Sequence, residues 1–155
     1  MSTLPSHVTE FLSSQHFAVA GVSRTGTSAA NAIFARLRRA GFDVFPINPH
    51  ATELEGVRAY PNITAIGTPV DGVVVATHPD VAVDVVREAA GAGVRRVWFH
   101  RSFGQGSVSQ EAVDECGARG IRCIVGGCPL MFCEPVDVAH RCMRWWLQRT
   151  GRLPR

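Results

Sequence analysis

The stretch AGVSRTGTSAAN, at 20–31, places side chains that can bind phosphate beside a backbone that can turn tightly. It overlaps FAVAGV at 17–22, an apolar run typical of a strand buried on both faces. Gly21 allows a tight turn or the close approach of a ligand. Ser23 offers a hydroxyl, and the planar guanidinium of Arg24 can pair with phosphate oxygens. These residue types predict a phosphate-binding turn, and a purely structural turn is the alternative.

The helix expected next, over 28–41, would supply the rest of such a site. Ser28 or Thr27 can cap its first turn, Asn31 lies one turn inside it and Gly41 ends it. The backbone N–H groups at a helix N-terminus attract phosphate. We therefore expect the turn and the start of this helix to bind the ligand together.

The second expected strand, DVFPIN at 43–48, bears on which ligand this is. NAD-binding folds usually carry an acidic residue about 20 residues past the glycine loop. Asn48 stands near that position, and an uncharged amide tolerates a phosphorylated ribose. This disfavours NAD and leaves NADP or coenzyme A. An arginine often accompanies NADP, but the nearest candidates, His50 and Arg58, do not decide between the two.

Strands and helices alternate along the chain, which predicts an α/β fold. We expect a single-domain, Rossmann-like, three-layer sandwich whose mainly parallel sheet has about five strands, with its ligand at the carboxyl ends of the strands. The expected strands are 17–22, 43–48, 71–78, 94–100 and 121–126; the expected helices are 6–14, 28–41, 79–93, 107–120 and 136–150. Residues 1–14 would form an N-terminal helix, 15–130 the main domain and 131–155 a C-terminal helix packed on it. Pro46 suits an edge strand, and Ser107 with Gln110 has the spacing of a capping box.

Composition narrows the classes of function. The formal charge is +3 and every basic side chain other than histidine is an arginine, so chemistry that needs lysine is excluded. The arginines are scattered, which does not favour a nucleic-acid partner. No apolar run reaches the length of a membrane span. Five cysteines without a CxxC spacing, and no signal peptide, predict reduced thiols in the cytoplasm.

GVSRTGTSAANAIFARLRRAGFDVFPINP, at 21–49, resembles the CoA-binding domain proteins. Their motif runs from glycine–x–serine through a short loop and a serine-led helix to a strand ending in [V/I]NP. The resemblance continues through 71–100 and ends near GGCP at 126–129, so it covers about residues 15–130. The chain is also similar to the CoA-binding domain of the alpha subunit of succinyl-CoA synthetase. The order and spacing of the motifs carry the resemblance.

The resemblance implies roles for particular residues. The diphosphate would be cradled by Gly21, Val22, Ser23 and Arg24, with Ser28 at the helix start. Asn48 and Pro49 would lie beside the adenosine ribose. The adenine or the pantetheine entrance would be bordered by Thr77, His78 and Pro79.

Two histidines and a cysteine lie at the same predicted edge of the sheet. His78 and His100 end neighbouring strands and could contact the ligand, bind a metal or act as acid and base, or each donate one hydrogen bond to a loop carbonyl. Cys128, in GGCP, could be a nucleophile of lowered pKa, although a lone cysteine is more often a small buried hydrophobe. We expect His100 in the ligand site and assign no catalytic residue.

The C-terminal region carries further candidates. Cys133, His140 and Cys142 lack the paired spacing of a structural zinc site, so no metal is expected. Of Trp145 and Trp146, at least one is expected to pack in the core, and the other could cover the contact of a homodimer.

The sequence thus favours a binding protein for coenzyme A or an acyl-CoA, a carrier or sensor rather than a catalyst. One alternative is an enzyme, either an NADP-dependent reductase or a CoA-dependent acyl transferase that uses Cys128 or His100. A second is a protein-interaction module with a vacant ligand site, which exposed Trp145 or Trp146 would favour.

Overall fold

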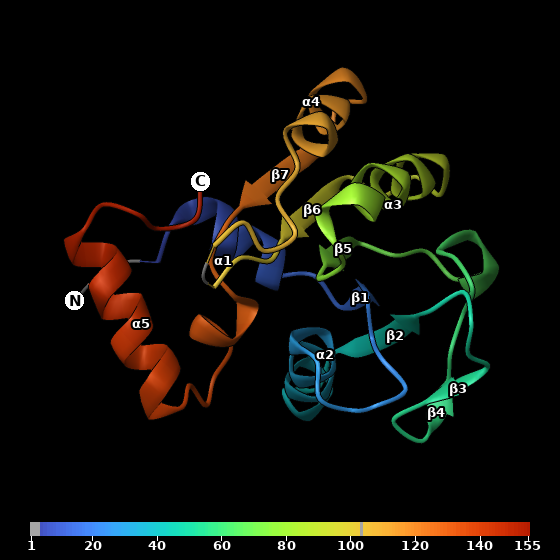
Figure 1. Ribbon diagram of the computed structural model, residues 1–155, viewed down its shortest axis with the longest axis horizontal. Helices are drawn as coiled ribbons and strands as arrows, with labels where there is room; N and C mark the ends of the chain where they lie inside the picture. Colours follow the sequence, from blue (N-terminus) through green and yellow to red (C-terminus); the bar gives the residue numbers. More distant parts are fainter. Residues whose placement is uncertain (1–3, 103) are drawn as a thin grey trace.

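A computed structural model of the chain describes residues 4–102 and 104–155. Its main sheet has five parallel strands in the order β2-β1-β5-β6-β7 (Figure 1). The strands are β1 (His16–Ala20), β2 (Asp43–Ile47), β5 (Gly72–Val75), β6 (Arg96–Phe99) and β7 (Arg122–Val125). The chain runs outward from β1 to β2 and then returns to the other side of β1, so strand order reverses between β1 and β5. The predicted Rossmann-like α/β fold is confirmed.

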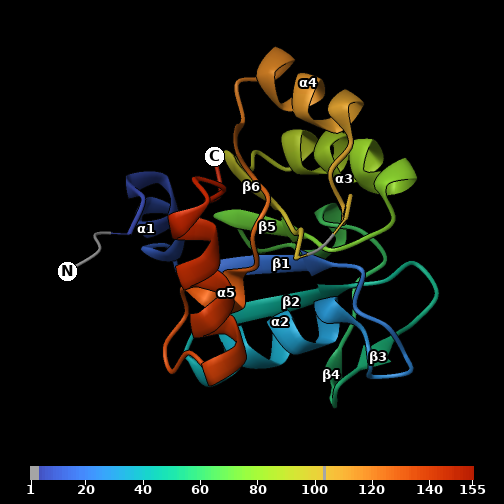
Figure 2. The same cartoon turned by 60° about the vertical axis from the view of Figure 1, so that its left-hand side comes forward.

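In the described part of the chain, five helices cover the two faces of this sheet. They are α1 (Ser6–Leu12), α2 (Ala29–Arg39), α3 (Pro79–Gly91), α4 (Gln110–Ala118) and α5 (Val138–Arg149). α3 and α4 lie together on one face, whereas α1, α2 and α5 lie on the other (Figure 2). The two-residue strands β3 (Glu53–Leu54) and β4 (Val57–Arg58) form a small antiparallel ribbon beyond β2. Short 3₁₀ turns occupy Thr64–Ile66 and Pro129–Met131.

The core has two layers because side chains alternate along the strands. On β1, Phe17 and Val19 pack toward α1 and α2, while Ala18 and Ala20 pack toward α3. All four are buried, as expected for a central parallel strand with helices on both faces. Trp98 on β6 is also fully buried on the first side. The sheet therefore forms a rigid base for the loops at its carboxyl edge.

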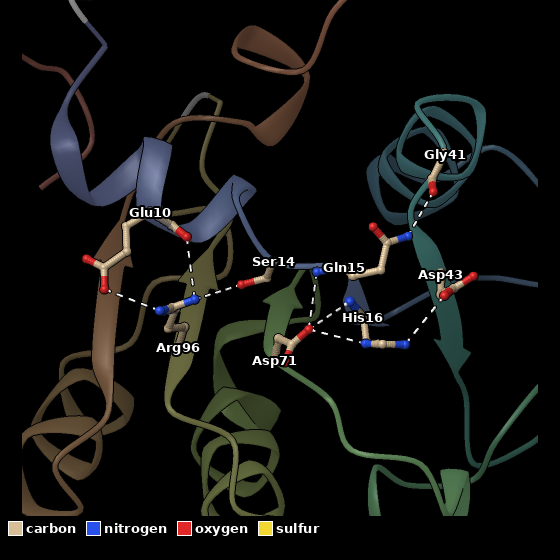
Figure 3. A network of polar contacts seen from close by, with 8 residues as sticks. All are labelled: Glu10, Ser14, Gln15, His16, Gly41, Asp43, Asp71 and Arg96. Carbon is tan, nitrogen blue, oxygen red and sulfur yellow. Dashed lines mark hydrogen bonds and ion pairs between the residues drawn. The ribbon is translucent and has the colours of Figure 1, made fainter.

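A polar network fixes the opposite, amino edge of the sheet (Figure 3). An oxygen of Asp71, just before β5, accepts hydrogen bonds from the backbone amides of His16 (2.9 Å) and Gln15 (3.2 Å). These bonds hold the pKa of Asp71 below its usual value. Arg96 at the start of β6 forms an ion pair with Glu10 of α1 (3.3 Å). With the carboxylate of Asp43 on β2, 3.4 Å from His16 Nε2, the network ties α1 and the starts of four strands together, far from the edge where a ligand is expected.

One predicted helix start is wrong. The fourth helix begins at Gln110, and Ser109 rather than Ser107 caps it, since the Ser109 hydroxyl accepts from the Ala112 amide (3.4 Å). The hydroxyl of Ser107 instead donates to the carbonyl of Thr77 (2.7 Å) and is buried. The Ser107 side chain, which the capping-box spacing assigned to the helix, therefore makes a tertiary contact with Thr77 instead.

Two further expectations can be compared with the structure. Pro46 lies on β2 at the edge of the sheet, as predicted, because proline lacks the N–H that an inner strand would need. The expectation that Trp145 or Trp146 packs in the core is wrong: their exposed fractions are 57% and 48%. Leu147 is the buried residue of α5. In the described part of the chain, no helix is both long and apolar enough to cross a membrane.

Candidate functional site

A cavity of about 580 Å³ lies at the carboxyl edge of the sheet, where strand order reverses between β1 and β5. This volume falls in the range of small-molecule sites, and the position is where open α/β sheets bind ligands. We call it the first-turn cavity, because the turn between β1 and α2 forms one wall. The other walls come from the end of β2, Thr77 after β5, and α3. Of the predicted site residues, the structure brings together Gly21, Val22, Ser23, Arg24, Asn48, Pro49 and Thr77 around this cavity.

Gly21 is required by the neighbouring strand rather than by a ligand. Its φ is +103°, in the region that favours glycine. A Cβ at this position would lie 2.3 Å from the carbonyl oxygen of Ala76, which follows β5. The close approach expected at Gly21 is thus between two backbone segments. This backbone contact between Gly21 and Ala76 fixes where the turn crosses the edge of the sheet.

Asn31 holds the turn from inside the molecule. The side chain is only 3% exposed. Its Oδ1 accepts hydrogen bonds from the Ser23 amide (2.8 Å) and the Ser28 hydroxyl (2.5 Å). Its Nδ2 donates to the Ser23 carbonyl (2.9 Å) and to Oε1 of Glu55 (2.5 Å). Asn31 does not line the cavity, and its polar atoms are used to fix the backbone around Ser23.

Asn48 holds the same turn from the side of β2. Its Nδ2 donates to the carbonyl of Val22 (2.9 Å), and its Oδ1 accepts from the amide of His50 (2.8 Å). The backbone N–H of Asn48 donates to the Tyr60 carbonyl (2.9 Å). Asn48 lines the cavity, and each end of its side chain has one partner within the protein, so one N–H and one lone pair remain for a ligand.

The groups that remain for a ligand are few. Arg24 lines the cavity and is exposed, and no ion pair joins it to a carboxylate of a described residue. Within that same set of residues, the backbone amide of Arg24 donates to no acceptor, whereas the Ser23 amide donates to Asn31 and Val22 is fully buried. The hydroxyls of Ser23 and Thr25 lie 2.8 Å apart and both residues line the cavity. A guanidinium, an amide and two hydroxyls are suited to an anionic group such as a phosphate.

One wall of the cavity was missed by sequence reasoning. The α3 residues Val81, Asp84, Val85 and Glu88 all line it. Their spacing of three, four and seven residues puts them on one face of a helix, and this pattern was readable in the sequence. Burial raises the pKa of Glu88 above its usual value. The cavity therefore has a cationic side at Arg24 and a carboxylate side on α3.

The remaining predicted residues lie outside the cavity lining. Ser28 caps α2, accepting from the Asn31 amide (3.2 Å), as predicted. His78 caps α3 and its Nδ1 lies 3.2 Å from a carboxylate oxygen of Asp80. Pro79 is the first residue of that helix. His100 is 9% exposed, its Nε2 lies 3.1 Å from the Ser102 hydroxyl, and burial lowers its pKa.

Cys128 has the environment of a buried structural thiol. It is almost fully buried, and burial raises its pKa to about 12. Neither Cys128 nor His100 lines the first-turn cavity. Among residues 4–102 and 104–155, no three histidine, cysteine or acidic side chains come together in a way that could hold a metal ion.

Solved structures resemble this chain closely in fold. A hypothetical protein from Pyrococcus horikoshii OT3 superimposes with a TM-score of 0.73 at 24% identity, over 83% of this chain and 93% of that one. A conserved hypothetical protein from Pyrococcus furiosus gives a TM-score of 0.65 at 29% identity, over 74% of this chain and 94% of that one. The dinucleotide-forming acetyl-coenzyme A synthetase 1 of Ca. Korarchaeum cryptofilum gives 0.62 at 28% identity, over 70% of this chain but only 25% of the synthetase.

No curated protein sequence matches the chain. A family model does, and it covers most of the chain: the CoA binding domain matches residues 15–134. The matched segment contains the whole sheet and every residue named above around the first-turn cavity. The fold predicted from the residues and the family predicted from the resemblance agree with this match. The chain belongs to the family of CoA-binding domain proteins.

Proposed function

We propose that the protein binds coenzyme A or an acyl-CoA in the first-turn cavity, and that it acts as a carrier or sensor without catalysing a reaction. The observation that carries this proposal is the guanidinium of Arg24, which forms no ion pair with a described residue and lines a cavity formed by the β1–α2 turn. Family membership supports coenzyme A as the ligand. The diphosphate would lie against the guanidinium and the backbone amide of Arg24, where charge-assisted hydrogen bonds can form.

The charges around the cavity also suggest how the ligand is oriented. Phosphates are repelled by the carboxylates of Asp84 and Glu88, so they would lie on the opposite side, near Arg24 and His50. The carboxylates can accept hydrogen bonds from ribose hydroxyls or from an adenine amino group. Val81, whose side chain is 45% exposed, and Val85 offer an apolar surface for the base.

The choice of coenzyme A over NAD and NADP depends on the family rather than on the cavity. Asn48 does replace the usual acidic residue at the end of β2, but Asp84 and Glu88 bring carboxylates to the same cavity from α3. The missing acid on β2 therefore discriminates less than its position in the sequence suggests. A direct comparison of ligands is needed.

The test is to identify what the purified protein carries and what it binds. Mass spectrometry of the small molecules released by denaturation should detect CoA or an acyl-CoA. Calorimetric titration should show binding of CoA and weaker or no binding of NADP and NAD. Binding of NADP without binding of CoA would refute the proposal.

Arg24→Ala provides the site-specific arm of this test. Removing a charge-assisted hydrogen bond costs about 1.5–3 kcal/mol, so CoA should bind at least about tenfold more weakly. Arg58→Ala is a matched control, because Arg58 stacks on Tyr60 and does not line the cavity. Equal affinity of the Arg24 variant and the unmodified protein would remove Arg24 from the site.

A second candidate function is a protein-interaction module. It is favoured by Trp145 and Trp146, which are both largely exposed on α5, beyond the residues that match the family model. If neither CoA nor NADP nor NAD binds at millimolar concentration, the protein-interaction module becomes the favoured function over a nucleotide-binding protein. Sedimentation of the protein and of Trp145→Ser would then show whether the exposed indole mediates self-association.

A further inference from the structure

We propose that a second cavity, beside the C-terminal end of the chain, binds an organic anion in which one carboxylate is joined to an apolar body. This C-terminal cavity, of about 660 Å³, is lined among others by Arg101, Val125, Trp146, Leu147, Arg152 and Leu153. It shares no lining residue with the first-turn cavity. The inference therefore does not depend on the proposed binding of coenzyme A.

The arginine side chains that line this cavity favour an anionic ligand. Among the described residues, Arg101, Arg152 and Arg155 line this cavity, and no aspartate or glutamate side chain does. No carboxylate of a described residue forms an ion pair with Arg101 or Arg152. The guanidinium groups of Arg101 and Arg152 repel one another, and a carboxylate placed between them would relieve that repulsion. The planar guanidinium also matches the two oxygens of a carboxylate.

The two guanidinium groups that carry the argument are held in place. The Arg152 guanidinium lies over the ring of Trp146, 5.7 Å from its centroid. The Arg101 side chain lies against the backbone of Gly126, where a Cβ would come within 3.0 Å of its Nη2. Ordering these side chains in advance lowers the entropy lost on binding.

The remaining lining explains why the ligand should be more than a small ion. Val125, Leu147 and Leu153 are apolar, and Trp146 adds one indole. A cavity with apolar walls and convergent polar groups is typical of an organic ligand rather than of a hydrated ion. The carboxylate would meet the arginines and the apolar body would cover these side chains.

The walls are built by packing that exists before any ligand arrives. The Val125 amide donates to the Arg155 carbonyl (2.7 Å) and the Arg155 amide to the Val125 carbonyl (3.2 Å), so the last residues pair with the edge of β7. Nε2 of His7 donates to the Pro154 carbonyl (2.9 Å). Figures 1 and 2 both place this end of the chain beside α1. A Cβ on Gly127 would lie 2.5 Å from Pro154 Cγ, so the tail fits closely here.

Octanoate is a suitable probe, with acetate as the anion alone and 1-octanol as the apolar body alone. The indole N–H signals of the ¹⁵N-labelled protein, assigned with Trp145→Phe and Trp146→Phe, report the site. Octanoate should shift the Trp146 signal in a saturable way and leave Trp145 unmoved. Its Kd should be at least about tenfold lower than that of acetate or octanol, which corresponds to about 1.4 kcal/mol.

Arginine variants complete the test. Arg101→Gln and Arg152→Gln should each weaken octanoate binding about tenfold, as expected for loss of a charge-assisted contact. Arg149→Gln is the matched control, because Arg149 lies over Trp145 at 5.2 Å in the same way but does not line the cavity. The proposal is overturned if octanol binds as tightly as octanoate, if Trp146 does not respond, or if Arg149→Gln weakens binding as much as Arg152→Gln.

Discussion

Replacement of Asn31 by aspartate tests whether this buried side chain holds the β1–α2 turn. The variant keeps the size of the side chain and the acceptor for the Ser23 amide. It loses both donated hydrogen bonds, one to the Ser23 carbonyl and one to the Glu55 carboxylate. It also places a second carboxylate beside that of Glu55, because Nδ2 of Asn31 lies 2.5 Å from Oε1 of Glu55 in the original protein.

The size of the effect follows from these contacts. A hydrogen bond between neutral groups contributes about 1 kcal/mol to stability, and one to a charged group contributes about 1.5–3 kcal/mol. Glu55 is exposed, so the lower part of the second range applies. Asn31→Asp should therefore lower the free energy of unfolding by about 2–4 kcal/mol. For a chain of this length, Tm should fall by roughly 5–15 °C.

Urea denaturation measures the stability, and calorimetry measures the affinity for CoA, which should fall about tenfold because the turn loses its fixed shape. The double variant Asn31→Asp with Glu55→Gln is the control. In it, the new carboxylate can accept from the amide introduced at position 55, so the stability lost at that contact should return, while the loss at the Ser23 carbonyl remains. The reasoning is refuted if Asn31→Asp is within about 0.5 kcal/mol of the original protein, since surface changes are of that size, or if the second substitution restores nothing.

Three further expectations follow from single positions. Gly21→Ala should lower the free energy of unfolding by about 2–5 kcal/mol, because it adds backbone strain and overlap with the neighbouring strand. Gly67→Ala, with φ +71° and open space around it, should lower it by only about 1–2 kcal/mol. Equal losses of stability in urea denaturation would contradict the overlap at Gly21. Asp71 has a lowered folded pKa, so its contribution is present above the unfolded pKa near 3.8 and is lost as pH falls through the folded value. Asp71→Asn should therefore cost about 1–2 kcal/mol at pH 7 and progressively less as pH falls below about 3.8, and a deficit independent of pH would exclude this linkage. Iodoacetamide at pH 8 should label the exposed Cys142 readily and label Cys128 more slowly than in the unfolded protein. Fast, selective labelling of Cys128 would show that it is a reactive nucleophile after all.

The sheet and its helices were readable from the sequence because their signals are local. Apolar runs marked the five strands, and Ser28 marked the start of α2 correctly. Pro46 on the edge strand follows from its missing N–H alone. The helix cap was predicted at Ser107 rather than Ser109 because the sequence offers two serines two residues apart. Only the tertiary contact with Thr77 decides which of them is free to cap.

The site was readable in part. The structure brings the glycine turn and the end of β2 together at one cavity, since the carboxyl ends of parallel strands share an edge; their role in binding a ligand stays a prediction. The α3 wall was missed although its helical spacing was visible, because nothing local says which face of a helix turns toward a ligand. The C-terminal cavity depends on Arg155 pairing with β7, a contact between distant segments that residue spacing does not reveal.

The roles of the two asparagines show how the structure changes the chemistry expected from a motif. The resemblance implies that Asn48 lies beside the ribose, and the structure does place it in the cavity. One N–H of its Nδ2 donates to Val22 and its Oδ1 accepts once, from His50, so one N–H and one lone pair remain for a ligand. Asn31, on α2, is different, because both N–H groups of its Nδ2 donate and its Oδ1 accepts two hydrogen bonds within the protein. We therefore expect Asn31 to position the turn that presents Arg24 without contacting the ligand, so its substitution should alter affinity only together with stability.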